Sequence, residues 1–379
     1  MWEYDIYVLF RNGSNDLAQE RRPPLIHIEI EPVWRFRRDN SAQSLLIILT
    51  LLNEIRVTGK IGRAAERVGV SYRHAWNLIE TWSAFFEAPL VERKQGRGTS
   101  LTPLGGKLVW AGQRLEARLG PQLQNLSQEL ETEINQLLPH GPSIIRVHAS
   151  HGFAVSKLRE LLSREANLGV DLRYVSNQSS LVSLAHDECD LAGLHVPHGN
   201  LRKSTVAAAK EWLTPNVYRV IGLVTREMGL MVKRGNPLGV VSVEQLLEPG
   251  VRFVNRDPDS GTRLLFDRLL AQQGLDGSRI NGYPQVEFTH AAVAAYVASD
   301  MADVSFGVEA AARQFDLDFV RLVTEDYFFV CRQQLLELEP MKRVLAIMRS
   351  DEFRDAISEL PGYRCKDAGV IKTIREAFQ

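Results

Sequence analysis

The stretch "IGRAAERVGVSYRHAWNLI" at residues 61–79 constrains the fold of this chain more than any other. Apolar residues recur at helical spacing on both sides of Gly69-Val70, which predicts two helices rather than one long helix. Gly69 suits the left-handed position that ends a helix, and Ser71 suits the N-cap of the next one. The stretch therefore indicates two helices joined by a tight turn, the helix-turn-helix arrangement.

The second of these helices has two unlike faces. Its apolar residues share one face: Ala75, Ile79, Trp82 and Phe86, with Trp76 beside them. Arg73, Asn77 and Glu80 fall on the opposite face. In the major groove of DNA, Arg can pair with guanine O6 and N7, and Asn can pair with adenine N6 and N7. The helix is therefore either a DNA-reading helix or part of an ordinary helical hairpin with a solvated polar face.

The residues that follow favour DNA. "PLVERKQGRGTSLTP" at 89–103 predicts a strand, a turn and a second strand, with Arg93, Lys94 and Arg97 at the tip. A basic β-hairpin after a recognition helix is a wing, placed to contact phosphate or the minor groove. The segment from Glu54 to Lys107 contains nine Lys and Arg residues and five Glu residues, so its net charge is +4, while that of the whole chain is −1.

Helices are expected on both sides of this region. "LIHIEIEPVWRF" at 25–36 alternates like a strand, and a helix is expected from about Ser41 to a stop at Gly59. Thr102 and Pro103 are typical of a helix start. The long helix that follows, in which Gly120-Pro121 is a site for a kink, carries one narrow apolar stripe: Leu119, Leu123, Leu126, Leu130, Ile134 and Leu137. The stripe either packs on its own domain or, as we favour, pairs two subunits.

The second half of the chain has a different pattern. After a linker, "PHGPS" at 139–143, short β-rich runs alternate with helical segments: "SIIRVHAS", "VDLRYVS", "DLAGLHV", "GVRFVN" and "DVSFGV". This alternation predicts an α/β domain with a largely parallel sheet, and its length of about 235 residues suits two lobes.

Four expected helix starts in this domain offer backbone N–H groups, the positive end of the helix dipole and hydroxyl donors. They lie at Ser150, at Ser179-Ser180, at Ser260, Gly261 and Thr262 with Arg263 in the first turn, and at Thr289-His290. Each alone is an ordinary N-cap. Four such starts following strands in one two-lobed domain favour an anion site between the lobes.

Residues 40–138 resemble the N-terminal domain shared by ModE-type molybdate-responsive regulators and LysR-type regulators. The resemblance is carried by "TGKIGRAAERVGVSYRHAWNLIETWSAFFEAPLVER" and "GTSLTPLGGKL". It implies that a set of residues in the second helix faces DNA: Ser71, Tyr72, Arg73, His74 and Asn77. It also implies that the following long helix pairs two subunits.

Residues 143–373 resemble the periplasmic-binding-protein-like domain found behind ModE-type modules and in molybdopterin-synthesis proteins. The resemblance is carried by segments such as "HASHGFA", "GVRFVNRDPDSGTR" and "EDYFFV". It implies a type-II fold of two lobes and a hinge, with a ligand held by one set of residues: Ser150, Ser179, Asn255, Arg256, Ser260, Thr262, Arg263 and Thr289, with Tyr327 near the hinge. The ligand modules of other molybdate regulators are usually small β-barrels, so molybdate follows by association only.

Arg256 and Arg263 bear on the chemistry of this ligand. A guanidinium suits a carboxylate, a phosphate or a sulfate. Molybdate can be held by hydroxyl and N–H groups alone. Either arginine could instead be a surface residue or a structural ion-pair partner, and both alternatives stay open at this point.

Other classes of protein are not indicated. The sequence contains no P-loop, no GxGxxG after a strand and no GxSxG, and the spacing of its histidines matches no zinc motif, so no enzymatic activity and no metal site are expected. No apolar run of membrane length, no export signal and no paired cysteines are evident, which indicates a cytoplasmic protein.

We therefore expect an α/β chain in four parts. Residues 1–39 are an extension with a strand, 40–101 a mainly α winged helix-turn-helix domain, 102–142 a linker and dimerisation helix, and 143–379 a two-lobed type-II effector domain. The expected function is a DNA-binding regulator, homodimeric or tetrameric, that binds an inverted-repeat operator and senses molybdate, tungstate, formate or another small anion without a cofactor. The alternative is an oxyanion- or molybdenum-cofactor-binding protein whose helix-turn-helix mediates protein contacts.

Overall fold

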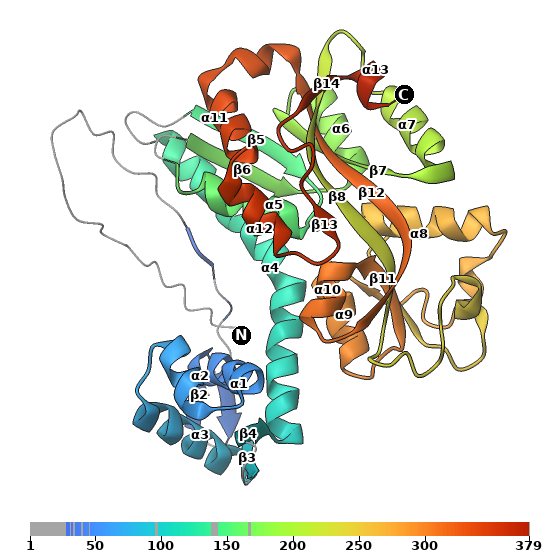
Figure 1. Ribbon diagram of the computed structural model, residues 1–379. Helices are drawn as coiled ribbons and strands as arrows, with labels where there is room; N and C mark the ends of the chain where they lie inside the picture. The colour runs from blue at the N-terminus through green and yellow to red at the C-terminus, as the bar shows by residue number, and fades with distance from the viewer. Residues whose placement is uncertain are drawn as a thin grey trace, which may run out of the picture. The chain divides into compact units, whose positions relative to one another are not determined.

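The computed structural model describes residues 28–30, 32, 35–38, 41–44, 46–94, 98–137, 143–165 and 168–378. Within these ranges the chain forms two compact units, which contain Glu29–Glu116 and Ala117–Gln379 (Figure 1). The division falls inside one long helix, α4 (Pro103–Leu137), which begins in the first unit and ends in the second.

The first unit is mainly helical. Its elements are β1 (Arg35–Arg38), β2 (Ser41–Ser44), α1 (Leu46–Thr58), α2 (Ile61–Val68), α3 (Tyr72–Phe86), β3 (Val91–Lys94), β4 (Gly98–Leu101) and the start of α4. Its core is built from buried residues of α1 to α4 and of the loop before β3: Ile48, Leu51, Leu52, Ile55, Ile61, Ala64, Ala65, Ala75, Ile79, Trp82, Leu90, Leu108 and Val109. The helices form because these apolar residues recur at helical spacing and meet in one core.

Two expectations about the start of this unit need correction: the predicted helix start is wrong, and the predicted strand is present only at Arg35 and Phe36, in β1. The helix expected from Ser41 begins at Leu46, because Ser41–Ser44 forms β2 and pairs antiparallel with β1. In the expected strand, residues 28–30 and 32 adopt no regular structure and residues 25–27 lie outside the described residues. Phe36 of β1 packs edge-on against Trp82 and Phe86 of α3. These residues are far apart in the sequence, so the local alternation of apolar residues does not predict this contact.

The second unit is built on one ten-stranded mixed sheet. Its main strands are β5 (Ser143–Ala149), β6 (Leu168–Tyr174), β7 (Leu191–Pro197), β8 (Tyr218–Val232), β9 (Phe253–Arg256), β10 (Val286–Glu287), β11 (Val304–Val308) and β12 (Asp318–Arg332). They lie in the order β10-β9-β11-β8-β12-β7-β5-β6, and β13 (Tyr363–Arg364) and β14 (Ile371–Thr373) also pair with β8.

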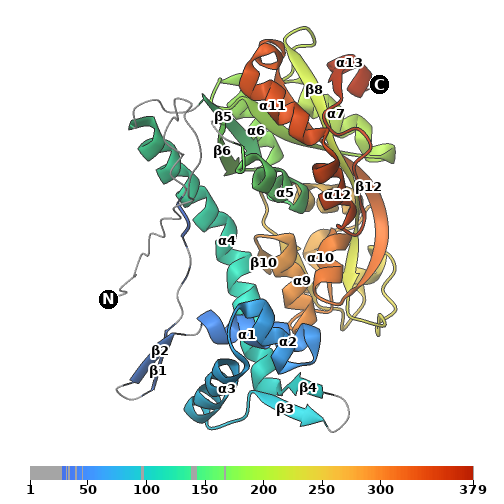
Figure 2. The ribbon, with the colours of Figure 1, turned by 60° about the vertical axis from the view of Figure 1, so that its left-hand side comes forward.

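Two long antiparallel strands join the halves of this sheet. β8 and β12 have 15 residues each and pair from Tyr218↔Arg332 to Val232↔Asp318 (Figures 1 and 2). The prediction of a largely parallel sheet is wrong, because five of the nine strand pairings of this sheet among the described residues are antiparallel and four of these five involve β8. The parallel pairs lie on either side of the two long strands, β5 with β6 and β7, and β9 with β10 and β11. Because β8 and β12 are the two strands of the described residues that run through both halves, they are the natural hinge.

Helices cover each half. The β5–β7 half, here called lobe I, is contacted by α5 (Phe153–Leu162), α6 (Asn177–Ala185), α7 (Arg202–Lys210) and α11 (Glu339–Met348). The β9–β11 half, lobe II, is contacted by α8 (Gly261–Gln272), α9 (His290–Ala298) and α10 (Glu309–Gln314) (Figure 1). The chain ends with α12 (Asp351–Ser358) and α13 (Ile374–Ala377). Short 3-10 turns lie at Gly199–Leu201, Glu244–Leu247, Gly277–Arg279 and Gln333–Glu337.

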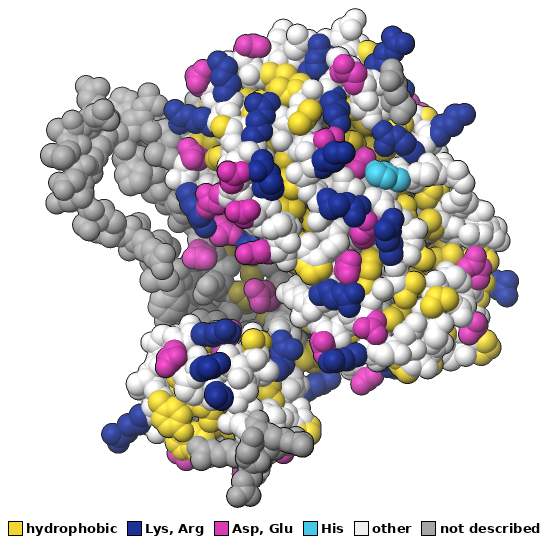
Figure 3. Space-filling model, viewed as in Figure 1, with side chains coloured by type: hydrophobic (Ala, Val, Ile, Leu, Met, Phe, Trp, Pro, Cys, Tyr) yellow, Lys and Arg dark blue, Asp and Glu magenta, His cyan; other side chains and the backbone are white. Residues whose placement is uncertain are grey.

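The charges on the surface and the lengths of the helices agree with the amino-acid composition. On the face of the second unit shown in Figure 3, Lys and Arg side chains are interspersed with Asp and Glu, as the net charge of −1 suggests. Among the described residues no helix combines the length and the apolar character needed to cross a bilayer.

Candidate functional site

The turn between α2 and α3 has the geometry of a helix-turn-helix. Gly69 ends α2 in the left-handed region (φ 75°), and the Val70 N–H donates to the Ala65 carbonyl at 3.0 Å. The Ser71 hydroxyl then caps α3 by accepting from the His74 N–H at 3.1 Å. Both residues act as the sequence predicts.

The two faces of α3 separate as expected. Ala75, Ile79 and Trp82 are buried in the core. The candidate DNA-facing residues are all exposed: Ser71, Tyr72, Arg73, His74 and Asn77. They lie within the first two turns of the helix, so the structure brings this set together on one accessible surface.

The predicted wing is a two-stranded hairpin. β3 and β4 pair antiparallel, with Lys94 opposite Gly98 and Arg93 opposite Thr99. Arg97 lies outside the described residues. Gly98 has φ 87°, and a Cβ there would lie 2.5 Å from the Gly59 carbonyl oxygen, so only glycine fits. This close approach and the hydrogen bond from the Thr99 N–H to the same oxygen tie the hairpin to the end of α1.

In the second unit, two of the four expected helix starts are confirmed. Ser260 caps α8 and Thr289 caps α9, each hydroxyl accepting from a backbone N–H three residues on. The other two differ. α6 begins at Asn177 under a Ser176 cap, which leaves Ser179 exposed in the first turn, and α5 begins at Phe153 after Gly152. Ser150 precedes that start, and its hydroxyl contacts Asn177 Oδ1 at 3.3 Å.

Arg256, at the end of β9, is the most unusual charged residue in the second unit. Its side chain is buried, and Nη2 donates to the Phe288 carbonyl at 2.7 Å. Nε and Nη1 have no hydrogen-bond partner among the described residues. Burial, followed by the nearby Arg226 guanidinium, lowers the pKa of Arg256 to about 9. The nearby Asp257 carboxylate raises this pKa by less than these two causes lower it. A buried guanidinium that makes no salt bridge among the described residues costs several kcal/mol and favours the binding of an anion.

Arg226 of β8 is the second buried arginine, and the sequence did not single it out. It pairs with Glu325 of β12, with Nη2 at 2.8 Å and Nε at 2.9 Å from Oε2, and both side chains are buried. A Cβ on Gly152 would lie 3.6 Å from Arg226 Nη1, so this guanidinium reaches the start of α5. Because Glu325 is committed to Arg226, its charge does not compensate Arg256.

Three histidines that are scattered in the sequence converge on these arginines. Burial is the main cause that lowers the pKa of each of His151, His195 and His290, and that of His151 falls to about 4. Arg256 lowers the pKa of His151 and His290 further, and Arg226 lowers those of His195 and His290. The neutral imidazoles can donate and accept hydrogen bonds but supply no counter-charge.

Thr262 and Tyr327, both predicted ligand residues, lie in the same cluster. The Thr262 hydroxyl is 3.3 Å from His290 Nε2. The Tyr327 ring stacks on His195 with centroids 3.7 Å apart, and its hydroxyl donates to the Ser150 carbonyl at 3.4 Å. We call the following residues the arginine–histidine cluster: Ser150, His151, His195, Arg226, Arg256, Thr262, His290, Glu325 and Tyr327.

Other predicted ligand residues have local structural partners. Arg263 Nε lies 2.9 Å from Asp267 Oδ1, and its guanidinium lies 4.2 Å from the centre of the Tyr283 ring. Its placement fits the structural ion-pair alternative. Asn255 donates to the Tyr283 carbonyl, and Ser260 donates to the Asp257 carbonyl.

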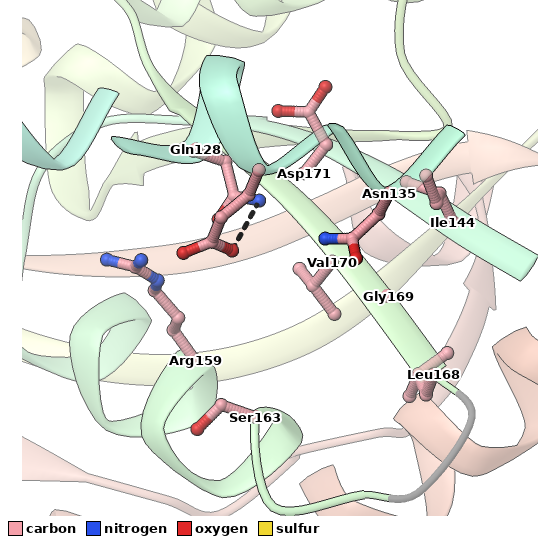
Figure 4. Close-up of a pocket in the computed structure, with 10 residues that line it drawn as sticks. Gln128, Asn135, Ile144, Arg159, Ser163, Leu168, Gly169, Val170 and Asp171 are labelled. Carbon is pink, nitrogen blue, oxygen red and sulfur yellow. Dashed lines mark hydrogen bonds between the residues drawn. The ribbon is translucent and has the colours of Figure 1, made fainter. Parts of the chain in front are cut away.

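The apolar stripe of α4 is exposed. α4 is continuous through Gly120-Pro121. Four of its predicted stripe residues are exposed hydrophobics: Leu126, Leu130, Ile134 and Leu137. The face that is buried instead is polar: Ser127, Gln128, Glu131 and Asn135. Figure 4 shows Gln128 and Asn135 on the α4 side of a small cavity of about 50 Å³, with Arg159 of α5 and Ser163, directly after α5, opposite.

Comparisons with known proteins match two separate parts of the chain. Residues 158–349 match the PBP superfamily domain, and residues 48–106 match the bacterial regulatory helix-turn-helix proteins of the lysR family. The uncharacterized protein YvgK of Bacillus subtilis (strain 168) is 30% identical over 52% of this chain and 64% of its own length. The molybdenum transport protein ModE of Azotobacter vinelandii is 38% identical over 22% of this chain and 32% of its own. The chain thus spans less than two thirds of the length of either relative.

Solved structures with similar folds include full-length BenM, which is 15% identical over 84% of this chain and 97% of its own, with a TM-score of 0.40. A phosphate transporter substrate-binding protein from Clostridium perfringens, with bound phosphate, is 10% identical over 57% of this chain and 97% of its own, with a TM-score of 0.41.

Proposed function

The chain belongs to the PBP superfamily and carries a lysR-family regulatory helix-turn-helix, and from this premise we propose that it is a transcriptional regulator that binds double-stranded DNA and responds to a small anion. The lysR family is one of regulatory proteins, which confirms the prediction that the chain is not an enzyme. In this proposal residues 40–101 bind DNA, 102–142 link and pair the subunits, and 143–379 bind the anion, and the protein works in the cytoplasm.

The observation that carries the anion proposal is the buried Arg256 with two nitrogens that lack hydrogen-bond partners among the described residues. An anion in contact with Nε and Nη1 would supply the missing charge and the missing acceptors together. The neutral His151 and His290 and the Thr262 hydroxyl add hydrogen-bonding groups around it. Lobe II supplies Arg256 and lobe I supplies His151, so the anion would be held between the lobes.

Two kinds of anion fit these groups. A guanidinium with neutral donors suits a small carboxylate such as formate, and it also suits tetrahedral oxyanions. The name of the Azotobacter relative, a molybdenum transport protein, favours molybdate or tungstate among the oxyanions. The positive charge of Arg256 would help to hold any of these anions.

The DNA and subunit parts of the proposal rest on two exposed surfaces. α3 presents Arg73 and Asn77 outward, as a base-reading helix requires. α4 presents Leu126 and Leu130 to solvent, and a second copy of the same helix would cover such a stripe. A homodimer, or a tetramer formed from two dimers, would place two α3 helices on an inverted-repeat operator.

A thermal-shift experiment on the full chain tests the anion proposal. Molybdate, tungstate, sulfate, phosphate and formate are added in turn, and a ligand at 100 times its dissociation constant adds about 2.7 kcal/mol of stability. We expect at least one of these anions to stabilise the wild type and to lose this effect in Arg256→Met. Arg263→Met is the matched control, because its guanidinium is paired with Asp267.

Two results would contradict the proposal. Either no anion of this panel stabilises the protein, or Arg256→Met responds as the wild type does. Anion binding without any retardation of duplexes selected from a random-sequence DNA pool would favour the alternative, in which the helix-turn-helix contacts protein.

A further inference from the structure

The helix α4 is hydrogen-bonded to both lobes of the second unit. In lobe I the Asn125 side chain binds the backbone of Tyr174 at the end of β6: Oδ1 accepts from the Tyr174 N–H at 2.9 Å, and Nδ2 donates to its carbonyl at 3.4 Å. In lobe II the Thr289 hydroxyl donates to the Ala117 carbonyl at 2.9 Å, and Arg118 Nε lies 3.0 Å from Glu287 Oε2. The two sets of contacts lie about 12 Å apart along the helix.

The contact in lobe II leads directly to Arg256. Glu287 lies opposite Arg256 in the parallel pairing of β10 with β9. Between Glu287 and Thr289, the Phe288 carbonyl accepts the hydrogen bond from Arg256 Nη2 at 2.7 Å. The segment Glu287–Thr289 is therefore held by Arg256 at its centre and by α4 at both of its ends.

The contact in lobe I leads to the same cluster from the other side. The Tyr174 ring lies edge-on against His151, with centroids 4.8 Å apart. The Asn125 side chain is hydrogen-bonded to the backbone of the same tyrosine. Each lobe thus has a short connection between α4 and a residue of the arginine–histidine cluster, and each connection consists of buried or half-buried groups.

Movement of the lobes about β8 and β12 would strain these connections. A hydrogen bond is lost when its donor and acceptor separate beyond about 3.5 Å. A helix is stiff along its axis, so α4 cannot follow two lobes that move apart while it keeps both sets of bonds. A shift of one lobe by even a few ångströms would break one set or carry the helix with it.

We propose that α4 is the element through which the anion site changes DNA binding. The contacts of Ala117 and Arg118 make its position depend on lobe II, and the contact of Asn125 makes it depend on lobe I. This inference rests on the proposed function. Anion contact with Arg256 orders the Glu287–Thr289 segment and sets how far the two lobes are apart. α4, which also carries the exposed apolar stripe and begins in the first unit, takes up a position that depends on the ligand. Arg118 and Asn125 are positioning residues and do not touch the ligand.

Variants of the full chain at each end of this connection test the inference. Arg118→Gln removes the ion pair to lobe II, and Asn125→Ala removes the two bonds to lobe I; both are combined in a double variant. The matched control is Arg313→Gln, because Arg313 is as exposed as Arg118 (47% against 43%) and pairs with Glu309 inside lobe II. Molybdate and formate are the probes, and DNA affinity is measured by retardation of a selected duplex with and without each probe.

The expected result separates binding from its consequence. A coupling between two sites typically changes affinity by about 5- to 150-fold. In the wild type and in Arg313→Gln a stabilising probe should change the DNA affinity by about 10-fold. In the double variant that change should fall below about 2-fold, while the probe still raises the melting temperature and the DNA affinity without probe stays within about 3-fold of the wild type.

Three outcomes would overturn the inference. A double variant that keeps the full ligand-dependent change in DNA affinity would overturn it alone and leave the proposed function standing. An Arg313→Gln variant that loses the change equally would show that the effect is not specific to α4. A wild type that no probe stabilises would overturn the proposed function, and this inference with it. If the double variant does not fold, the single variant Arg118→Gln replaces it in the test, because Arg118 is half-exposed.

Discussion

Arg226 and Glu325 lie opposite each other on the two hinge strands, and Arg226 Nη2 is 2.8 Å from Glu325 Oε2, with the two side chains 3% and 2% exposed. This pair is neutral as a unit. The charge that remains in the arginine–histidine cluster is therefore that of Arg256. The pair also joins β8 to β12 at the level where the two lobes meet, so the hinge and the ligand site share one set of buried charges.

We expect Glu325→Gln to destabilise the protein in the absence of ligand. The substitution keeps the size of the side chain but leaves Arg226 buried without its counter-charge, close to Arg256, which makes no salt bridge among the described residues. Loss of one member of a buried ion pair costs about 3–5 kcal/mol. Urea denaturation at pH 7 measures this loss, and a stabilising anion should recover part of it.

Glu309→Gln is the control for this prediction. Glu309 pairs with Arg313, which is about half exposed, and such pairs contribute about 1 kcal/mol or less. Equal effects of the two substitutions would mean that the Arg226–Glu325 pair is not the buried charge centre described above.

The second prediction concerns DNA. Arg73→Ala combined with Asn77→Ala should abolish sequence-specific retardation, because each lost base contact costs about 1–3 kcal/mol. Both residues are exposed, so the melting temperature should change little. Arg67→Ala removes the same charge from α2, where Arg67 pairs with Glu54. It should weaken binding to all sequences modestly, and specific binding that survives in the double variant would rule out α3 as the reading helix.

The third prediction concerns subunit pairing. Leu130→Glu combined with Ile134→Glu places two charges in the exposed stripe of α4. A buried apolar seam does not tolerate unpaired charge, so the variant should sediment as a monomer at micromolar concentration while its far-UV circular dichroism is unchanged. Glu129→Lys, at an exposed position outside the stripe, should keep the mass of the wild type. A wild-type monomer, or a variant of unchanged mass, would contradict pairing through this stripe.

Local sequence signals predicted the elements whose determinants are adjacent in the chain. Gly69 and Ser71 lie next to the helices they end and begin, and the alternation of apolar residues in β5, β6 and β7 needs no distant partner. The exposed polar face of α3 follows from helical spacing alone. The pairing of β1 with β2 was missed, because it depends on Phe36 meeting Trp82 and Phe86 across the first unit.

The candidate anion site was only partly predictable. Arg256 follows a clear strand and was identified from the sequence. Arg226 lies inside a long apolar strand with no motif around it, and only the register of β8 against β12 brings it to Glu325. His151 and His290 are about 140 residues apart and meet because the two lobes fold onto each other. No spacing rule contains this information, since the contact is produced by the hinge strands.

The last prediction concerns pH. His151, His195 and His290 have pKa values below the value of about 6.5 that they regain on unfolding, and burial is the main cause. Below pH 6.5 these histidines bind protons in the unfolded chain that they do not bind in the folded chain, down to about pH 4 for His151. The free energy of unfolding therefore falls as the pH falls below about 6.5. Each histidine contributes at most about 1.4 kcal/mol per pH unit. Urea denaturation at pH 7.5, 6.5 and 5.5 measures the slope, which should be smaller in His151→Asn and unchanged in His186→Asn, an exposed position. Stability that is constant from pH 7.5 to 5.5 would show that these imidazoles are not held neutral in the folded protein.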